Sequence, residues 1–260
     1  FNEAVVINRE IRDTLVTEDP KNTELIKPFV IGDDVRKYYI NFQERYLIFT
    51  RRGVDIKKFP AIERYLIQFK KRLMPKPKDF KGKNWEGRKP GSYQWYEIQD
   101  TVDYYPEFEK PKIVWPEIAK ESRFTFDDAG LFLNKTCFFT PFDDLYLLGI
   151  LNSSAIWSYL TNLCSVLGDP KKGGRLLQQE IYLSHLPIRA INFNNPKEKA
   201  MHDRLVTLVD RMLELNKKRH ALPATSQREA IEREIAVTDE RIDDLVYELY
   251  GITKGEREII

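Results

Sequence analysis

The stretch Lys27-Pro28-Phe29-Val30-Ile31-Gly32-Asp33-Asp34-Val35 decides how the first part of the chain folds. Its apolar run is punctuated by a proline and a glycine, and its acidic pair can cap a short helical turn. We therefore predict a strand that leads into a loop. Two other short apolar runs, at residues 4–7 and 46–49, predict further strands.

A helix is predicted over residues 60–73. A proline stands at its first position, which helices tolerate. Apolar residues recur at three- and four-residue spacing, as on one face of a helix: Ile62, Leu66, Phe69 and Leu73. Pro75 and Pro77 cannot continue this helix, so a long polar loop is expected as far as Gly91.

The next part of the chain predicts more strands and one further helix. Strands are expected at residues 95–98, 112–115 and 137–139, and a turn at residues 127–130. Residues 143–163 are predicted to form one helix capped by an aspartate pair. The expected fold class is α+β, with a mixed β-sheet core and packed helices.

Two long helices are predicted after a polar break at residues 192–196. Each has a narrow apolar stripe with charged flanks, and residues 222–226 form the turn between them. We expect an antiparallel helical hairpin that packs on a neighbour and ends at Tyr250-Gly251. The predicted division is a domain at residues 1–190 followed by a hairpin at residues 191–260.

Composition narrows the class of protein. The formal net charge is only +2, so the total charge does not indicate a nucleic-acid partner. Cys137 and Cys164 each lie beside bulky apolar residues, which favours buried free thiols in a reducing, intracellular compartment. No segment approaches the ~20 apolar residues that span a bilayer, so no membrane partner is expected. The chain begins at Phe1 without a methionine, and we expect it to be a piece of a longer polypeptide.

Positive charge is concentrated within residues 64–89, where ten basic residues face two acidic ones, Asp79 and Glu86. Lysine and arginine suit phosphates, while guanidinium groups and flat aromatic rings suit base edges. The run therefore predicts a nucleic-acid surface. A solvated basic loop around core tryptophans is the alternative interpretation.

Two smaller basic clusters add to this surface. Arg51-Arg52 follows a predicted strand, and the glycines in residues 171–175 would let backbone amides approach a phosphate, unless that segment is only a flexible surface loop. The candidate DNA-binding residues are Arg51, Arg52, Lys71, Arg72, Lys76, Lys78, Lys81, Lys83, Trp85, Arg88, Lys89, Tyr93, Lys171, Lys172 and Arg175.

These candidates divide by expected role. The loop at residues 76–89 is expected to read bases, with Arg88 as the candidate for two hydrogen bonds to one guanine. Phosphate contacts are expected from Arg51, Arg52, Lys71, Arg72, Lys171, Lys172 and Arg175. Trp85 and Trp95 either anchor the loop in the core or contact DNA.

No catalytic or metal centre is predicted. The sequence has three histidines, His185, His202 and His220, and none has a Cys or His partner at metal-ligand spacing. The common phosphate-loop, dinucleotide and nucleophile-elbow motifs are absent from the sequence. A magnesium-dependent nuclease built from Asp33 or Asp34 with Asp55 and Lys57 is a weaker alternative, because the same residues suit a helix cap and a surface turn.

Seven stretches follow one another in a characteristic order: IKPFVIGDDVRKY (26–38), FPAI (59–62), GRKPGSYQWYEIQ (87–99), FEKPKIV (108–114), LNS (151–153), LPI (186–188) and DLVYELYG (244–251). With them the chain resembles, over nearly all its length, the TaqI-like C-terminal specificity domain. This domain occurs in type IIG restriction-modification enzymes and phage-exclusion methyltransferases.

The resemblance implies a domain that reads double-stranded DNA. It would follow an S-adenosylmethionine-dependent adenine-N6 methyltransferase domain of the same polypeptide, which flips the adenine. The Asn-Pro-Pro-Tyr motif and the cofactor-binding glycine motif are absent here, so catalysis is expected upstream of Phe1 and no cofactor is expected in this chain. The setting implied is the prokaryotic cytoplasm. The hairpin would fix the domain against the methyltransferase or a helical spacer. A protein-interaction scaffold that never touches DNA is the alternative.

Overall fold

The computed structural model describes residues 2–169 and 174–260 and divides into two compact units. Unit 1 holds the chain up to Val30 together with Phe42–Lys110 and Gly130–Phe132, and unit 2 holds Ile31–Asn41, Pro111–Ala129 and Leu133–Ile260. This division differs from the predicted boundary at residue 190, because the two long C-terminal helices pack into unit 2.

Unit 1 is built on a small sheet. Strand β5 (Tyr46–Ile48) pairs antiparallel with both β1 (Val6–Ile7) and β2 (Ile26–Val30), and the sheet continues from β2 to β9 (Phe132–Leu133). The strands predicted at β2 and β5 are confirmed. The strand predicted at residues 4–7 is confirmed only for Val6-Ile7, since α1 covers Asn2–Val5.

The remaining elements of unit 1 are helical. They are α2 (Arg9–Glu18), α3 (Pro60–Ile67), α4 (Lys70–Leu73) and the 3-10 helices η1 (Pro20–Glu24), η3 (Ile56–Lys58) and η4 (Tyr105–Glu109). Ile48, Ile62 and Leu66 are fully buried in the core of this unit. Burying each such side chain contributes ~1.5–3 kcal/mol, so the core fixes α3 on the sheet.

The single helix predicted over residues 60–73 is wrong, because α3 and α4 are separate. The chain turns at Gln68-Phe69, where Phe69 leaves the helical conformation (φ −105°, ψ 5°) and its N–H donates to the carbonyl of Leu66 at 2.9 Å. The ring of Phe69 still packs on Tyr65, with centroids 5.5 Å apart. The apolar spacing therefore runs through the break and conceals it.

Unit 2 contains three small sheets. In the first, β6 (Lys112–Pro116) lies between β10 (Cys137–Thr140) and β8 (Thr125–Asp127). In the second sheet, β12 (Arg175–Leu177) lies between β11 (Val166–Leu167) and β7 (Ile118–Ala119). The third is the hairpin of β3 (Val35–Arg36) with β4 (Tyr39–Ile40). The strands predicted near β6 and β10 and the turn at residues 127–130 are confirmed, as is the α+β class. The strands lie in several small sheets.

The helices of unit 2 begin with the short η2 (Gly32–Asp34) and continue as α5 (Leu145–Leu151), α6 (Ser154–Leu163), α7 (Glu180–Leu183), α8 (Pro196–Ala221), α9 (Ser226–Tyr250) and α10 (Lys254–Arg257). No helix of the described residues has the length and apolar character needed to cross a membrane. Cys164 is buried and Cys137 half-buried, both as free thiols.

The helix predicted over residues 143–163 is divided into α5 and α6 at Asn152-Ser153. The Asn152 side chain pairs with the backbone of Phe124, donating to its carbonyl at 2.8 Å and accepting from its N–H at 3.1 Å. The Ser153 hydroxyl caps α6 by accepting from the N–H of Ile156. The polar run Asn152-Ser153-Ser154 thus ends one helix and begins the next through these hydrogen bonds.

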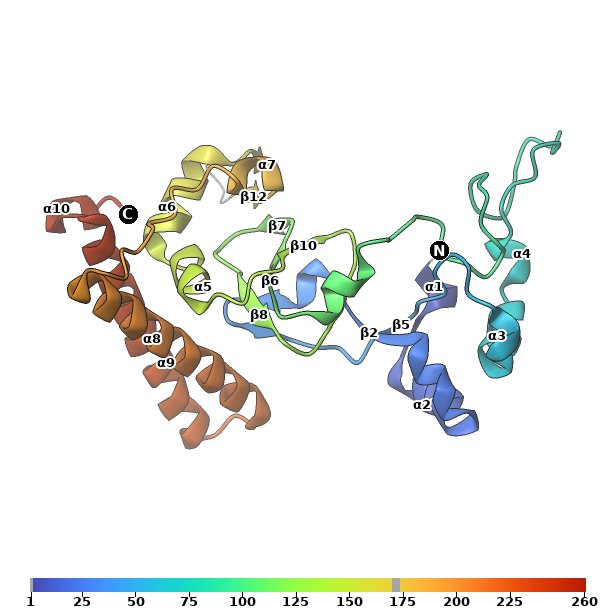
Figure 1. Ribbon diagram of the computed structural model, residues 1–260, viewed down its shortest axis with the longest axis horizontal. Helices are drawn as coiled ribbons and strands as arrows, with labels where there is room; N and C mark the ends of the chain where they lie inside the picture. The colour runs from blue at the N-terminus through green and yellow to red at the C-terminus, as the bar shows by residue number, and fades with distance from the viewer. Residues whose placement is uncertain (1, 170–173) are drawn as a thin grey trace. The chain divides into compact units, whose positions relative to one another are not determined.

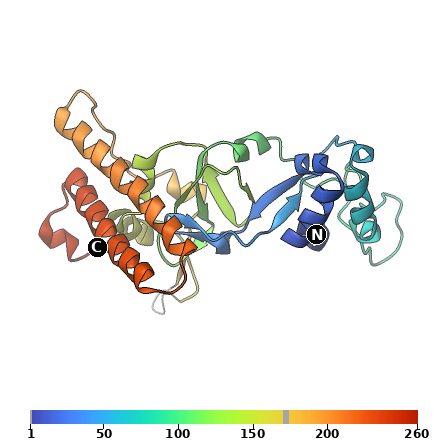
Figure 2. The same cartoon turned by 90° about the horizontal axis from the view of Figure 1, so that it is seen from below.

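The predicted C-terminal hairpin is confirmed. Helices α8 and α9 run side by side in opposite directions (Figures 1 and 2), and Gly251 ends α9 in the left-handed conformation at φ 68°. Helix α8 packs on α5 at Gly149, where an added Cβ would lie 2.7 Å from Val209 and 3.0 Å from Leu205. The hairpin is therefore part of the core of unit 2.

One ion pair lies completely inside unit 2. Lys112 of β6 stands opposite Asp127 of β8 in the strand register, their side chains are 0% and 1% exposed, and the ammonium donates to the carboxylate. The other carboxylate oxygen of Asp127 accepts from the N–H of Ala129 at 2.9 Å. The pair links the central strand to its edge and to the following turn.

Replacing Asp127 with alanine is expected to lower the free energy of unfolding by about 3–5 kcal/mol, because the buried Lys112 charge loses its counter-charge. Urea unfolding measures this loss. The control in the same unit is Lys199→Met, which removes the exposed Lys199–Asp203 pair and should change the free energy by about 1 kcal/mol or less. Equal losses in the two variants would contradict a special role for the buried pair.

Candidate nucleic-acid interface

The basic loop after α4, defined as residues 74–99, contains no helix or strand but is tightly held. Met74 and Lys76 pair with the backbone of Arg88: the N–H of Arg88 donates to the carbonyl of Met74 at 2.9 Å, and the N–H of Lys76 donates to the carbonyl of Arg88 at 3.0 Å. These bonds close the segment between them into a smaller loop.

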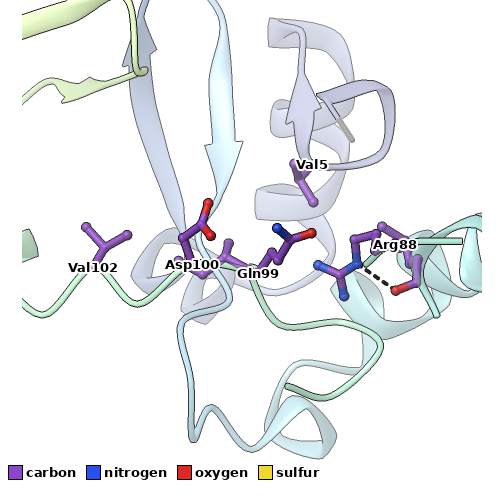
Figure 3. Close-up of a pocket in the computed structure, with 7 residues that line it drawn as sticks. Val5, Arg88, Gln99, Asp100 and Val102 are labelled. Carbon is purple, nitrogen blue, oxygen red and sulfur yellow. Dashed lines mark hydrogen bonds between the residues drawn. The ribbon is translucent and has the colours of Figure 1, made fainter. Parts of the chain in front are cut away.

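The guanidinium group of Arg88 is the centre of this arrangement (Figure 3). Its Nε donates to the carbonyl of Leu73 at 2.7 Å. Leu73 is the last residue of α4, so this bond supplies a partner for a carbonyl at the end of the helix. Its two outer nitrogens donate to three carbonyls at 2.6–3.2 Å, those of Gln94, Trp95 and Glu97. Four of the five N–H donors of the arginine therefore bind the backbone of the chain itself.

The ring of Tyr93 lies against this guanidinium, with 4.4 Å between the Arg88 Cζ and the ring centroid. Arg52 approaches the same ring at 5.5 Å and donates to the Ser92 hydroxyl at 3.0 Å and to the Gln99 carbonyl at 2.8 Å. Burial lowers the pKa of Arg88 from its ordinary value, against the opposing effects of Tyr93 and Glu97. The guanidinium remains charged at neutral pH.

These contacts give three of the predicted DNA-binding residues a role within the fold. Tyr93 is only 4% exposed, so its ring supports the loop and offers no face to DNA. Arg88 directs its fork at backbone carbonyls, and Arg52 directs its fork at the Gln99 carbonyl and the Ser92 hydroxyl, so in this conformation neither presents a free fork to a guanine or a phosphate. The sequence singles out Arg88 as a candidate DNA-binding residue but does not indicate its partners, because every residue has a backbone carbonyl.

The strand predicted at residues 95–98 is wrong, because this segment packs on the turn after β5. The Glu97 carboxylate is buried and accepts from the N–H groups of Gly53 and Gln94, each at 2.7 Å. The Tyr96 hydroxyl donates to the carbonyl of Val54 at 3.1 Å, and the N–H of Ile98 donates to the carbonyl of Thr50 at 2.8 Å. The segment is thus held mainly by side-chain hydrogen bonds and not by the backbone pairing of a β-strand.

Both tryptophans of the loop anchor it. Trp85 is half-buried, its Nε1 donates to the Met74 carbonyl at 3.3 Å, and its ring meets Phe80 edge-on with centroids 5.1 Å apart. Trp95 packs against the core of unit 1, and its ring lies edge-on to the Tyr96 ring with 5.6 Å between the centroids. Of the two interpretations of these residues, the structure supports the loop anchor.

The lysines of the loop are arranged differently from its arginine. Lys78, Lys81, Lys83 and Lys89 are exposed, and the described residues provide no ion pair for any of them. Lys76 is half-buried, with its ammonium 5.3 Å from the Phe80 ring. The charges outside the smaller loop are partly paired: Lys71 with Glu86 at 2.8 Å and Arg72 with Glu3 at 3.2 Å, while Arg51 lies over Tyr105 at 5.3 Å.

A hollow of about 270 Å³ lies beside this loop. Figure 3 shows its lining, which combines the apolar Val5 and Val102 with Arg88, Gln99 and Asp100. The Gln99 amide and the Asp100 carboxylate have no hydrogen-bond or ionic partner among the described residues. These two positions were not predicted from the sequence, since they fall outside the basic run.

Unit 2 carries its own group of cations. Arg175 of β12 is exposed and lines a hollow of about 340 Å³ together with Lys120 and Arg123. In the register of β12 with β7, Leu176 pairs with Ala119, so Arg175 and Lys120 are each next to a paired residue. The acidic residues Asp33 and Glu117 also line this hollow. Lys120 and Arg123 were missed because they are scattered in the sequence. The predicted contacts Lys171 and Lys172 lie outside the described residues.

The residues of the nuclease alternative serve as caps. Asp34 accepts from the N–H of Ile31 at 2.9 Å, and Asp55 accepts from the N–H of Lys57 at 3.2 Å. Over the described part of the chain, no three His, Cys, Asp or Glu residues are grouped as metal ligands would be. His202 lies beside Tyr146, and burial together with Arg219, Arg228 and Arg36 lowers the pKa of His220.

Comparison with known proteins identifies the family. A model of the TaqI-like C-terminal specificity domain matches residues 27–188, and the chain belongs to this family. The resemblance inferred from the sequence motifs is thus confirmed.

One solved structure with a similar fold is that of the type IIL restriction-modification enzyme MmeI in complex with DNA. Its TM-score is 0.60 at 16% sequence identity, so the likeness concerns the fold. The match covers 96% of this chain but only 31% of that one, so the present chain spans about a third of its length.

Replacing Arg88 with lysine keeps the charge but removes the planar fork. A hydrogen bond to a charged group contributes about 1.5–3 kcal/mol, so we expect the free energy of unfolding to fall by about 2–4 kcal/mol. Limited proteolysis should also cut residues 74–99 faster. Lys89→Ala is the control, because this neighbour is exposed, and it should change neither quantity. Unaltered stability and protease resistance in Arg88→Lys would refute the loop-holding role.

Proposed function

We propose that this chain reads a specific sequence in double-stranded DNA. It would be the target-recognition domain of a type IIG-like restriction-modification enzyme whose adenine-N6 methyltransferase domain lies elsewhere in the same polypeptide. S-adenosylmethionine would bind that other domain, and the present domain would place the site so that the adenine can be flipped. Such an enzyme acts in the prokaryotic cytoplasm in defence against phages.

The observation that carries this proposal is the set of exposed lysines on a held loop. Lys78, Lys81, Lys83 and Lys89 project from a segment whose backbone is fixed by Arg88 and the two tryptophans. A flexible lysine loop would lose conformational entropy on binding phosphates, and a held loop has lost much of it already. Membership in a specificity-domain family supports the same function.

The cations divide between phosphate and base contacts in a way that the sequence alone does not resolve. The exposed lysines are compact point charges that suit phosphates, with the exposed Arg51, Lys71, Arg72 and Arg175. Phosphate contacts give affinity and register, while sequence is read at base edges. The loop lysines therefore account for affinity, and the base readers have to lie beside them.

The chain itself has no part in methyl transfer under this proposal. Its residues hold the DNA, and the chemistry belongs to the domain that binds S-adenosylmethionine. The separation predicts that substitutions on the loop alter which DNA is bound and methylated without altering the binding of the cofactor to the complete polypeptide.

DNA binding by the complete polypeptide should fall steeply as salt rises from about 50 to 200 mM, because phosphate contacts release counterions. The double variant Lys81→Ala/Lys83→Ala should lower the slope of log affinity against log salt by about 1 for each lysine, uniformly over DNA sequences. Fluorescence anisotropy with labelled duplexes measures both effects.

The control is Lys217→Ala, which removes an exposed lysine of α8 far along the chain from the loop. It should leave the salt slope unchanged. Salt-insensitive binding to a protein partner, with no affinity for DNA, would instead favour the interaction-scaffold alternative.

A further inference from the structure

The hollow beside the basic loop contains two polar side chains that the fold does not use. Gln99 is half-buried and Asp100 exposed, and neither side chain has a partner among the described residues. In Figure 3 the two side chains leave the loop in different directions beside Arg88.

The backbone that carries these two side chains is fixed. The Gln99 carbonyl accepts from Arg52 at 2.8 Å, and the N–H of the preceding Ile98 donates to the Thr50 carbonyl at 2.8 Å. Arg88 holds the carbonyls of Trp95 and Glu97 just upstream. Two arginines and the turn after β5 therefore set where Gln99 and Asp100 lie. Such support from neighbouring residues is what a binding side chain needs to keep its geometry.

Both side chains can bind base edges, and the Asp100 carboxylate cannot bind a phosphate because it has no donor. A glutamine amide can donate to N7 and accept from the N6 amino group of adenine. A carboxylate only accepts, so it binds the amino groups of cytosine or adenine, and it repels phosphates and the carbonyl oxygens of guanine and thymine. A carboxylate in the hollow thus discriminates by repulsion as well as by attraction.

We propose that Gln99 and Asp100 are base-reading residues of this domain, and that they contact amino-bearing base edges in the major groove while the loop lysines hold the flanking phosphates. This inference rests on the proposed function. Arg52 and Arg88 are then positioning residues, which act on the bases only through the segment that they hold.

The test is a selection of DNA duplexes from a randomised pool by the complete polypeptide, followed by affinities for single-base variants of the selected site. Asp100→Asn has the same shape but can also donate, so preference for an amino-bearing base should fall at one base pair by about 5- to 150-fold. Gln99→Ala should relax a different base pair by a similar factor. Neither variant should lower the salt slope.

The matched controls are Asp103→Asn and Gln68→Ala, which remove an exposed carboxylate and an exposed amide that do not line the hollow. They should select the same site as the unmodified protein. Asp100 is exposed, so its variant should fold normally, and a thermal melt checks this.

An unchanged base preference in both Asp100→Asn and Gln99→Ala, from a protein that selects a site, would overturn the base-reading roles and leave the proposed function standing. If the unmodified polypeptide binds DNA without selecting any sequence, the proposed function itself fails.

Discussion

The contact between one guanidinium group and the carbonyls at both ends of a long loop is the constraint on which the candidate interface depends. Arg88 joins the end of α4 at Leu73 to the segment from Gln94 to Glu97. Without it, more than twenty residues rich in lysine and glycine would have to be ordered by their own weak contacts, at an entropic cost that grows with each residue. Arg88 therefore supplies, with the tryptophan anchors and the buried Glu97, the constraints that secondary structure supplies elsewhere.

Within the basic loop, arginine and lysine have different places: Arg88 is half-buried, and Lys78, Lys81, Lys83 and Lys89 are exposed. Arginine holds backbone because its planar fork offers several donors at fixed angles. Lysine offers a single hydrated charge on a flexible stem, and the loop presents lysines to solvent. Exposed positive charge and rigidity of the loop thus come from different residues, although the sequence shows both only as positive charge. The acidic and amide side chains of the hollow add a third kind of group to the same surface.

The fold was predictable where a pattern repeats along the chain. The hairpin of α8 and α9 and the strands β2, β5, β6 and β10 followed from apolar spacing, because each buries a continuous face. The break at Phe69 could not be seen, since apolar spacing continues through it. The break at Asn152 has a sequence signal, the polar run Asn152-Ser153-Ser154, which the prediction of one helix passed over. The aromatic composition of residues 95–98 predicts a strand, but the partners of this segment, Thr50 and Gly53, are set by tertiary contacts. At the interface, the basic run located the loop, but only the structure separates the exposed lysines from the engaged Arg88.

Nearly all the contacts that hold the basic loop lie within one uninterrupted part of the chain. The partners of Arg52, Arg88, Tyr93 and Glu97 fall between Thr50 and Gln99, inside the segment Phe42–Lys110 of unit 1. A single recombination event between related genes could therefore exchange the lysines, the hollow side chains and their supports together. The exchanged segment would include the residues that hold the loop in place. The side chains of the surface could therefore change in one step, without an intermediate sequence whose loop lacks these contacts.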